Sequence, residues 1–409
     1  MRWYVLLANK FSANNTKSFS RSITRLAILT VALSVAIMLL SIATVTEFQK
    51  AIKDKIIGLN GDILIESLEN VQRGEQNIFA NNDKSQLKFL DTIPNIKKIT
   101  FILNKPAIVR GKEEIEGVVA QAVDDSYDFE FIGQFITKGR KPNFTKDSNE
   151  VLISAHTQKN LGVKIGERIQ ILFFRNDDGG TRARALNPRV VGIFNTGISE
   201  YDKRTLCISK RSIARILPIN ESFSQVEVSV KVKSVLDKTL RLVEENLDPQ
   251  FFQVRSSEQR NWQIFEWLKI LDTNVWVIIA IMVLVAAITM CTTVLIIITE
   301  KTNTIGMLKA MGATNAEIRK LFVFQSGRIA FWGLLFGNAV ALILGYTQKY
   351  TKAIKLNADT YYLDHVVVSF KLQHIILINS FSFLLIVFIM FIPVSIISKF
   401  NPIKSIRFN

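Results

Sequence analysis

The sequence lacks the motifs that most nucleotide-binding and catalytic proteins carry. It contains no G-x-x-x-x-G-K-[ST] segment, so the chain has no P-loop and does not bind ATP in the usual way. The H-E-x-x-H, C-x-x-C and G-x-S-x-G patterns are also absent. The three histidines, His156, His365 and His374, do not have the spacing of a metal site. We therefore predict that the chain is not an enzyme and has no catalytic, cofactor-binding or metal-binding residues of its own.

Cysteine is scarce, with only Cys207 and Cys291 in the chain. The first lies in a long polar stretch and the second inside an apolar run, so we expect no intrachain disulfide. The formal net charge is +16, yet 48% of the residues are hydrophobic. This content is too high for a nucleic-acid-binding protein of this size, and we expect no nucleic-acid partner.

Charged residues are missing from four long apolar runs, residues 26–46, 273–299, 329–348 and 372–398. One such run could be a buried core helix, but four of this length predict four transmembrane helices. Proton- or ion-coupled transport normally needs charged residues inside the membrane, so the absence of Asp, Glu, Lys and Arg from these runs disfavours a secondary transporter. Asn338 is the most notable polar residue in these runs. We expect it to form a hydrogen bond between two helices.

Basic residues near the ends of the runs indicate the orientation. Residues 1–25, 300–328 and 399–409 are rich in lysine and arginine, which predicts that all three are cytoplasmic. Four lysines in residues 349–371 argue weakly against this. We predict cytoplasmic termini, an interfacial helix near the N-terminus and an extracytoplasmic segment at residues 47–272. A cleaved signal peptide is the alternative for the first run, but the basic region before it is too long.

A charged, helix-prone segment follows the second run at residues 300–328. Gly312 suits a helix C-terminus, and Thr314 and Glu317 have the spacing of a capping box that starts a second helix. These helix-end signals predict two short helices, each connected directly to the neighbouring span. Such a segment is suited to transmitting a movement of another protein to the spans. The expected contact residues are Glu300, Lys301, Ile305, Gly306, Leu308, Lys309, Met311 and Gly312, with Met307 completing an apolar face.

Residues 47–272 alternate between strand and helix patterns. We expect an α/β unit with a β-rich insertion at about residues 146–225. The predicted strands are residues 62–66, 96–103, 107–111, 114–122, 150–154, 168–174, 189–194, 226–232 and 251–255, and the predicted helices are residues 48–59, 85–90, 155–161, 234–247 and 260–271.

A polar stretch inside the insertion predicts a protruding hairpin at residues 174–189. Residues 175–188 read RNDDGGTRARALNP, which we interpret as a polar loop with a glycine turn. Two flanking strands, residues 168–174 and 189–194, would hold it. Its candidate docking residues are Arg175, Arg182, Arg184, Pro188 and Arg189.

The order of these parts resembles that of the MacB/Lol-type ABC transporter permeases. The stretch of residues 284–337, LVAAITMCTTVLIIITEKTNTIGMLKAMGATNAEIRKLFVFQSGRIAFWGLLFG, is similar to the family segment in which Glu-Lys precedes an Ile-x-x-Leu-Lys-x-x-Gly-Ala helix-turn. Residues 356–370, LNADTYYLDHVVVSF, resemble the lipoprotein-releasing (LolC/LolE-like) branch in particular, as does the insertion at residues 154–188.

The resemblance implies an α-helical membrane protein with a large α/β, porter-like domain between spans one and two. The implied parts are a cytoplasmic segment 1–25, span 26–46, periplasmic domain 47–272, span 273–299, coupling loop 300–328, span 329–348, periplasmic loop 349–371, span 372–398 and cytoplasmic tail 399–409. It further implies a multi-pass protein of the cell inner membrane that acts as a dimer.

The implied partners are two copies of a cytoplasmic ATPase that binds the ATP, a second permease that is identical or homologous, a lipoprotein substrate and a periplasmic lipoprotein carrier. In this family the carrier docks on the hairpin, and the match of our hairpin is positional. A MacB-like exporter or a cell-division-type permease is an alternative, although the former usually carries a fused ATPase. A membrane-anchored sensor is a third, but no cytoplasmic segment is large enough for an output domain.

Overall fold

The computed structural model describes residues 19–67, 86–111, 114–125, 127–144, 149–177, 180–219 and 223–395. The predicted interfacial helix falls largely outside these residues, and the predicted cytoplasmic tail lies wholly outside them. The chain divides into two compact units. We call Met1–Lys50, Trp267–Lys355 and Val366–Asn409 the helical unit, and Ala51–Glu266 with Leu356–His365 the outer domain.

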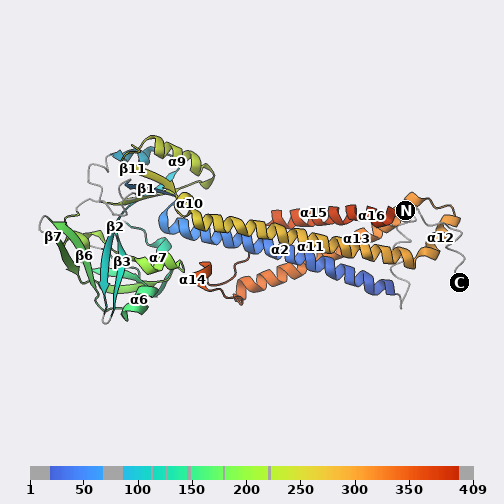
Figure 1. The fold of residues 1–409 in the computed structure, drawn as a ribbon, viewed down its shortest axis with the longest axis horizontal. Helices are drawn as coiled ribbons and strands as arrows, with labels where there is room; N and C mark the ends of the chain where they lie inside the picture. Colours follow the sequence, from blue (N-terminus) through green and yellow to red (C-terminus); the bar gives the residue numbers. More distant parts are fainter. Residues whose placement is uncertain are drawn as a thin grey trace. The chain divides into compact units, whose positions relative to one another are not determined.

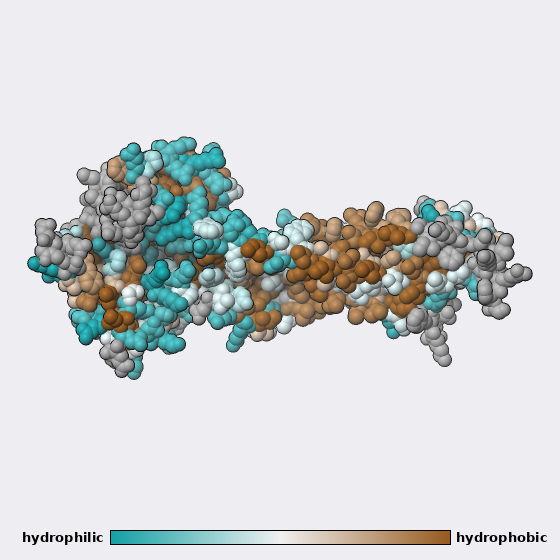
Figure 2. Space-filling view, viewed as in Figure 1, coloured by the Kyte–Doolittle hydropathy of each residue, from teal (hydrophilic) through white to brown (hydrophobic). Residues whose placement is uncertain are grey.

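Long helices form the helical unit (Figure 1). They are α2 (Phe19–Asn60), α11 (Trp262–Glu300), α13 (Asn315–Thr351) and α15 (Leu372–Ile389), with the short α12 (Thr302–Ala310) and α16 (Phe391–Ser395). Within the described residues, 4 helices are long and apolar enough to cross a membrane. The four predicted spans are therefore confirmed, and Figure 2 shows hydrophobic residues over this unit.

Glycines bring two of these helices close together. A Cβ atom added to Gly333 would lie 2.6 Å from Val31 Cγ1, and one added to Gly337 would lie 2.7 Å from the Ala32 carbonyl oxygen. Backbones can approach this closely only where side chains are small, which is how helices pack without a hydrophobic driving force between them. The spacing of Gly333 and Gly337 is thus the reason that α2 and α13 pack tightly.

Asn338 forms the predicted hydrogen bond between helices. Its Nδ2 donates to Asn379 Oδ1 at 2.7 Å, and Asn379 Nδ2 donates back to Asn338 Oδ1 at 2.9 Å. Each Nδ2 also donates to a carbonyl one turn earlier, Leu334 O at 2.6 Å and Ile375 O at 2.7 Å. The pair therefore satisfies its own polar atoms and fixes α13 against α15.

The described strands of the outer domain form one 11-stranded sheet. Its main path runs β11-β1-β10-β2-β3-β9-β5-β8-β4, and the ribbon of β6 and β7 joins at β2. The bounds are β1 (Ile63–Ser67), β2 (Ile96–Arg110), β3 (Ile115–Val123), β4 (Ile136–Gly139), β5 (Glu150–Ser154), β6 (Gln170–Asp177), β7 (Gly180–Leu186), β8 (Arg189–Phe194), β9 (Thr205–Ser209), β10 (Gln225–Val230) and β11 (Phe252–Ser256).

Short helices accompany the sheet (Figure 1). They are α5 (Glu130–Gly133), α6 (Ala155–Leu161), α7 (Ser199–Arg204), α8 (Lys210–Ala214), α9 (Leu236–Glu245), α10 (Ser257–Arg260) and α14 (Ala358–Tyr361), with the 3-10 turns η1 (Lys88–Thr92) and η2 (Lys233–Val235). Helix α6 begins and ends where its sequence indicates. The Ser154 hydroxyl accepts from Thr157 N, and Gly162 takes φ +63° after the last turn. The predicted fold class, four spans plus a large α/β domain, is confirmed.

Strand β2 connects two hydrophobic cores. Its first half pairs with β10, and its second half pairs with β3 and β6. Ile96 packs in a cluster with Phe223 and Val228, whereas Val109 packs in a separate cluster with Phe173. The α/β unit and the predicted insertion therefore share one sheet but bury two different sets of side chains.

Two local predictions about this region are wrong. Residues 96–103 and 107–111 form one strand, because Pro106 pairs with Val119 in unbroken register. Proline removes only its own N–H donor, which a strand can tolerate at a single position. Of the helix predicted at residues 85–90, Gln86 is helical, whereas its second half belongs to the 3-10 turn η1, Lys88–Thr92.

Candidate functional site: the coupling segment and the ribbon

The junction of α11 and α12 is nearly continuous. Helix α11 ends at Glu300 and Lys301 is the N-cap of α12, so that the Lys301 amide donates to Ile297 O at 3.1 Å. Lys301 Nζ lies 4.0 Å from Glu300 Oε1, which places the two predicted charges side by side. A displacement of α12 therefore acts directly on the end of a long helix.

The C-terminus of α12 is closed by a Schellman motif. Gly312 N donates to Lys309 O at 3.0 Å, and Ala313 N donates to Leu308 O at 2.9 Å. Gly312 has φ +90°, a conformation that side chains other than glycine rarely adopt. The predicted helix end at Gly312 is confirmed.

A capping box starts α13 two residues later. Thr314 Oγ1 accepts from Glu317 N at 3.3 Å, and Glu317 Oε2 accepts from Thr314 N at 2.9 Å. Both predicted members of the box are confirmed, and together they satisfy two backbone donors at the helix start. With the Schellman motif, the box gives the turn between α12 and α13 a defined geometry.

The predicted apolar face of α12 is divided between the interior and the surface. Ile305 is 3% exposed and packs in the core of the helical unit, and Gly306 is also buried. Ile305 is therefore a core residue and not part of a contact surface, which corrects the prediction. Met307 and Met311 are 55% and 83% exposed, and Leu308 and Lys309 are half-buried. The two methionines lie four residues apart, on one face of the helix.

The polar stretch of the outer domain is a two-stranded ribbon. We predicted a loop at residues 175–188, but β6 runs to Asp177 and β7 begins at Gly180, with these two residues paired. The flanking strands do not pair with each other as a hairpin. Strand β6 pairs with β7 and β2, whereas β8 pairs with β4 and β5. Pairing of the two strands in continuous register extends the ribbon into these polar residues.

Two of the predicted arginines, Arg182 and Arg184, lie two residues apart on β7 and therefore on one face of the ribbon. Arg175 pairs with Arg182, and Arg184 pairs with Phe173. Arg182 and Arg184 are exposed, and no carboxylate of the described residues lies within ion-pairing distance of either. The face is therefore a cationic surface open to an acidic partner.

The remaining two predicted docking residues lie away from this face. Pro188 is buried, and its carbonyl accepts from Ile169 N at 3.1 Å. Arg189 is the first residue of β8, and its amide donates to Asn149 O at 2.8 Å. Both residues are placed at the base of the ribbon by sheet hydrogen bonds, so we do not include them in the docking surface.

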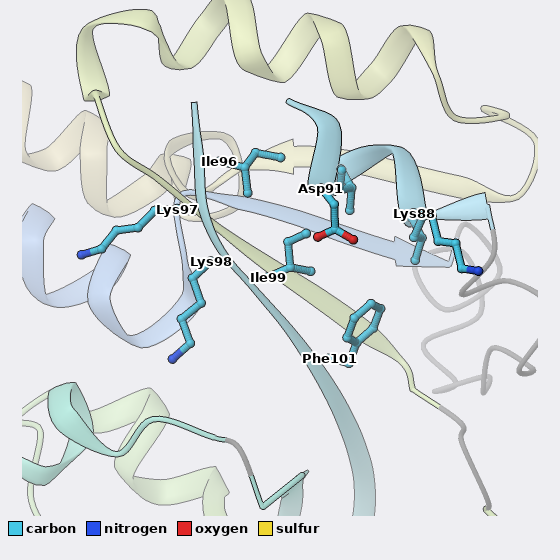
Figure 3. Close-up of a pocket in the computed structure, with 9 residues that line it drawn as sticks. Lys88, Asp91, Ile96, Lys97, Lys98, Ile99 and Phe101 are labelled. Carbon is cyan, nitrogen blue, oxygen red and sulfur yellow. The ribbon is translucent and has the colours of Figure 1, made fainter. Parts of the chain in front are cut away.

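A cavity of about 430 Å³ lies between η1 and the first half of β2 (Figure 3). Figure 3 shows Lys88 at one end, Lys97 and Lys98 at the other, and Asp91 and Ile99 between them. Lys98 is engaged, since its Nζ lies 3.4 Å from Asp128 Oδ2. The described lining offers one carboxylate and neither histidine nor cysteine, so its chemistry does not suit a metal ion.

Two titratable groups are buried in the sheet. Burial raises the pKa of Glu227 to about 8, so this carboxyl is largely protonated at neutral pH. Its Oε1 accepts a hydrogen bond from Gln225 Nε2 at 2.7 Å. Burial also raises the pKa of Cys207 to about 12. A thiol that stays protonated is a poor nucleophile, so Cys207 acts as a core residue.

Two family models match the chain and cover most of its length. The MacB-like periplasmic core domain matches residues 24–246, and the FtsX-like permease C-terminal domain matches residues 276–402. Four apolar helices, a capped segment between the second and third, and a sheet domain after the first define the class of ABC transporter permeases. The chain belongs to the LolC/LolE/MacB family of these permeases and is a multi-pass membrane protein.

Individual relatives extend over nearly the whole chain. The "Lipoprotein-releasing system transmembrane protein LolC" of Neisseria meningitidis serogroup B is 20% identical and covers 97% of this chain and 96% of its own. LolE of Haemophilus influenzae is 21% identical over 82% of both chains. The "Uncharacterized ABC transporter permease MJ1507" of Methanocaldococcus jannaschii is 28% identical over 54% of both. The crystal structure of the periplasmic region of MacB from Actinobacillus actinomycetemcomitans matches 52% of this chain at 14% identity, with a TM-score of 0.35.

Proposed function

We propose that the chain is the permease subunit of an ABC transporter that extracts lipoproteins from the inner membrane and passes them to a periplasmic carrier. ATP hydrolysis in two copies of a separate cytoplasmic ATPase drives the cycle, and a second permease, identical or homologous, completes the dimer. The observation that carries the proposal is α12, which follows the end of α11 directly, is closed by a Schellman motif at Gly312 and exposes Met307 and Met311. The lipoprotein cargo is supported by the full-length similarity to LolC.

The methionine face of α12 supplies the contact with the ATPase. Exposed apolar side chains on a short helix fit a groove on a partner protein, and this contact stabilises the complex when they are desolvated. Replacing a methionine by glutamate places a charge in that contact and costs on the order of 2 kcal/mol, or a tenfold or greater loss of affinity. The helix itself should persist, because Met307 and Met311 contribute little to the core.

Co-purification tests this assignment. The double variant Met307→Glu, Met311→Glu should lose the ATPase in mild detergent, whereas Met307→Leu, Met311→Leu should keep it. Asn315→Glu adds an acid at an exposed position on the next helix and should also keep it. Retention of a stoichiometric ATPase by the double glutamate variant would contradict the contact.

Orientation is part of the same proposal. The outer domain should face the periplasm and α12 the cytoplasm, with both termini cytoplasmic. In a variant without the two native cysteines, Lys238→Cys should react with an impermeant maleimide once the outer membrane is permeable. Asn315→Cys should react only after the inner membrane is broken. The reverse pattern would overturn the orientation and the direction of transport.

The cationic face of the ribbon is the proposed docking surface for the carrier. Arg182 and Arg184 are exposed and would make charge-assisted contacts worth about 1–3 kcal/mol each with an acidic surface. The variant Arg182→Glu, Arg184→Glu should leave folding and ATPase binding intact while lipoproteins accumulate in the inner membrane. Arg241→Glu, which makes the same charge change at an exposed position of α9, is the control. Normal sorting in the ribbon variant would remove the docking surface and leave the permease proposal in place.

The alternative is a MacB-like or cell-division-type permease with another substrate. The match of the MacB-like periplasmic core domain to residues 24–246 supports it. The two proposals differ in what accumulates when the protein is depleted. Mislocalised lipoproteins support the first, whereas normal lipoprotein fractionation with a functional ATPase complex supports the second.

A further inference from the structure

The loop between the third and fourth spans packs as part of the outer domain. Residues Leu356–His365 belong to that unit, although α13 and α15 on either side belong to the helical unit. The loop has internal structure, since Leu356 N donates to Asp364 O at 2.9 Å and Tyr362 N donates to Ala358 O at 2.8 Å. Tyr362 takes φ +61°, which is rare for a bulky residue and indicates that surrounding contacts hold it.

Lys55 of α2 is one of these contacts. Its Nζ donates to Tyr362 O at 2.7 Å and to Thr196 O at 2.6 Å, and it lies 5.3 Å from the centroid of the Phe135 ring. The two carbonyls are 307 and 141 residues away from Lys55 in the sequence. One ammonium group thus joins the helix of the first span, the turn between β8 and α7, and the loop after the third span. We call this arrangement the Lys55 joint.

The turn at Thr196 and Gly197 is held by hydrogen bonds that do not involve Lys55. Asp202 is 6% exposed, and its carboxylate accepts hydrogen bonds from Thr196 N at 3.1 Å, Thr196 Oγ1 at 2.7 Å and Gly197 N at 3.0 Å. These bonds orient the Thr196 carbonyl toward Lys55. The carboxylate also supplies the negative charge that a half-buried ammonium group needs nearby.

Gly197 allows the loop to come close. It has φ +70°, and a Cβ atom added there would lie 3.3 Å from Ala358 Cβ and 3.5 Å from Lys55 Nζ. Helices α14 and α7 are in contact at this point, as Figure 1 also shows. A larger residue at position 197 would push α14 away from the turn, so the joint depends on glycine as well as on lysine.

We propose that Lys55 is a positioning residue for coupling, which fastens the loop of residues 356–365 to the outer domain so that a displacement of α13 reaches the sheet. Helix α13 runs unbroken from the capping box at Thr314 to Thr351, and only residues 352–355 separate it from the fastened loop. Without the joint, α13 would still move with α12, but its motion would end in a loosely held loop. The proposal rests on the ATPase-driven part of the proposed function and not on the identity of the cargo.

Hydrogen–deuterium exchange on the full-length protein tests whether the joint holds the loop. In Lys55→Met, which keeps the length and removes the charge, the amides of Leu356 and Tyr362 should exchange at least tenfold faster, while those of β9 stay unchanged. Lys55→Arg should fall between this variant and the wild type. Lys50→Met removes an exposed lysine from the same helix and should match the wild type. Unchanged loop exchange in Lys55→Met would overturn the proposal, even if the permease proposal stands.

A second measurement tests coupling without reference to cargo. In the complex with its ATPase, the wild type should show an ATP-dependent change of exchange both at α12 and in the strands of the outer domain. Lys55→Met should hydrolyse ATP within twofold of the wild type and keep the change at α12, but lose most of the change in β9. Equal changes in β9 for both proteins would overturn the coupling role. Failure of the wild type to release lipoproteins would instead count against the proposed cargo alone.

Discussion

The helical unit and the outer domain differ in the kind of packing that stabilises each of them internally. In the helical unit, α2 and α13 approach each other closely where side chains are small, at Gly333 and Gly337. In the outer domain the fully buried residues include large ones, such as Phe173, Phe194 and Phe223. Lipid offers helices no hydrophobic gain on association, so they depend on close approach, whereas a water-exposed sheet gains free energy from every buried ring. Close approach of helices therefore stabilises the helical unit, whereas burial of large apolar side chains stabilises the outer domain.

The largest expected effect tests close approach in the helical unit. Gly337→Leu should destabilise the protein by more than about 3 kcal/mol, because even its Cβ atom would meet Ala32 O at 2.7 Å and Val35 Cβ at 2.9 Å. Thermal unfolding in detergent, followed by size-exclusion chromatography, measures this. Gly327→Ala on the same helix is the control, since a Cβ atom there meets nothing within 4 Å. Equal melting temperatures for the two variants would show that α2 and α13 do not rely on small residues.

The stability of the outer domain should depend on pH through the buried carboxyl of Glu227. The carboxyl of Glu227 has a folded-state pKa of about 8, above the ordinary value of 4.5, so folding favours its protonated form. Its stabilising contribution is complete below pH 4.5 and is lost as the pH rises toward 8. From pH 5 to pH 8 the wild type should lose on the order of 3 kcal/mol relative to Glu227→Gln. Urea unfolding of the full chain in detergent at both values measures it, and parallel pH profiles would refute the burial of an acid.

The smallest effect concerns the junction of the coupling segment. Thr314→Ala removes the cap of α13 and should cost about 1 kcal/mol, with Thr314→Ser close to the wild type. Increased hydrogen exchange limited to the first turn of α13 is the expected signature. Increased exchange along the whole of α13 would mean that the cap controls the helix and not only its first turn.

The sequence predicted best what depends on neighbouring residues. The four spans, the helix end at Gly312 and the capping box at Thr314 are local signals, and all are present. The spacing of Gly333 and Gly337 is an equally local signal, typical of closely packed helices. The burial of Ile305 could not be read in this way, because it depends on which face of α12 meets the long helices.

What depends on distant residues was missed. The ribbon resembles a loop because residues 175–182 are all polar or glycine, and its strand β6 pairs with β2, far away in the sequence. The Lys55 joint has no sequence signature, since both acceptors are backbone carbonyls, which every residue carries. Asn379 likewise gained its meaning only when the structure placed it against Asn338.

The reciprocal pair of Asn338 and Asn379 has a consequence for how the protein is made. An isolated asparagine resists entry into lipid because its amide gives up hydrogen bonds to water. Here each amide is saturated by the other and by its own helix, so the penalty disappears only when both spans are together. The third and fourth spans therefore favour joint insertion as a helical hairpin around the loop of residues 356–365. Insertion also fixes the register of the two helices, because a shift by one residue would remove both hydrogen bonds between the amides.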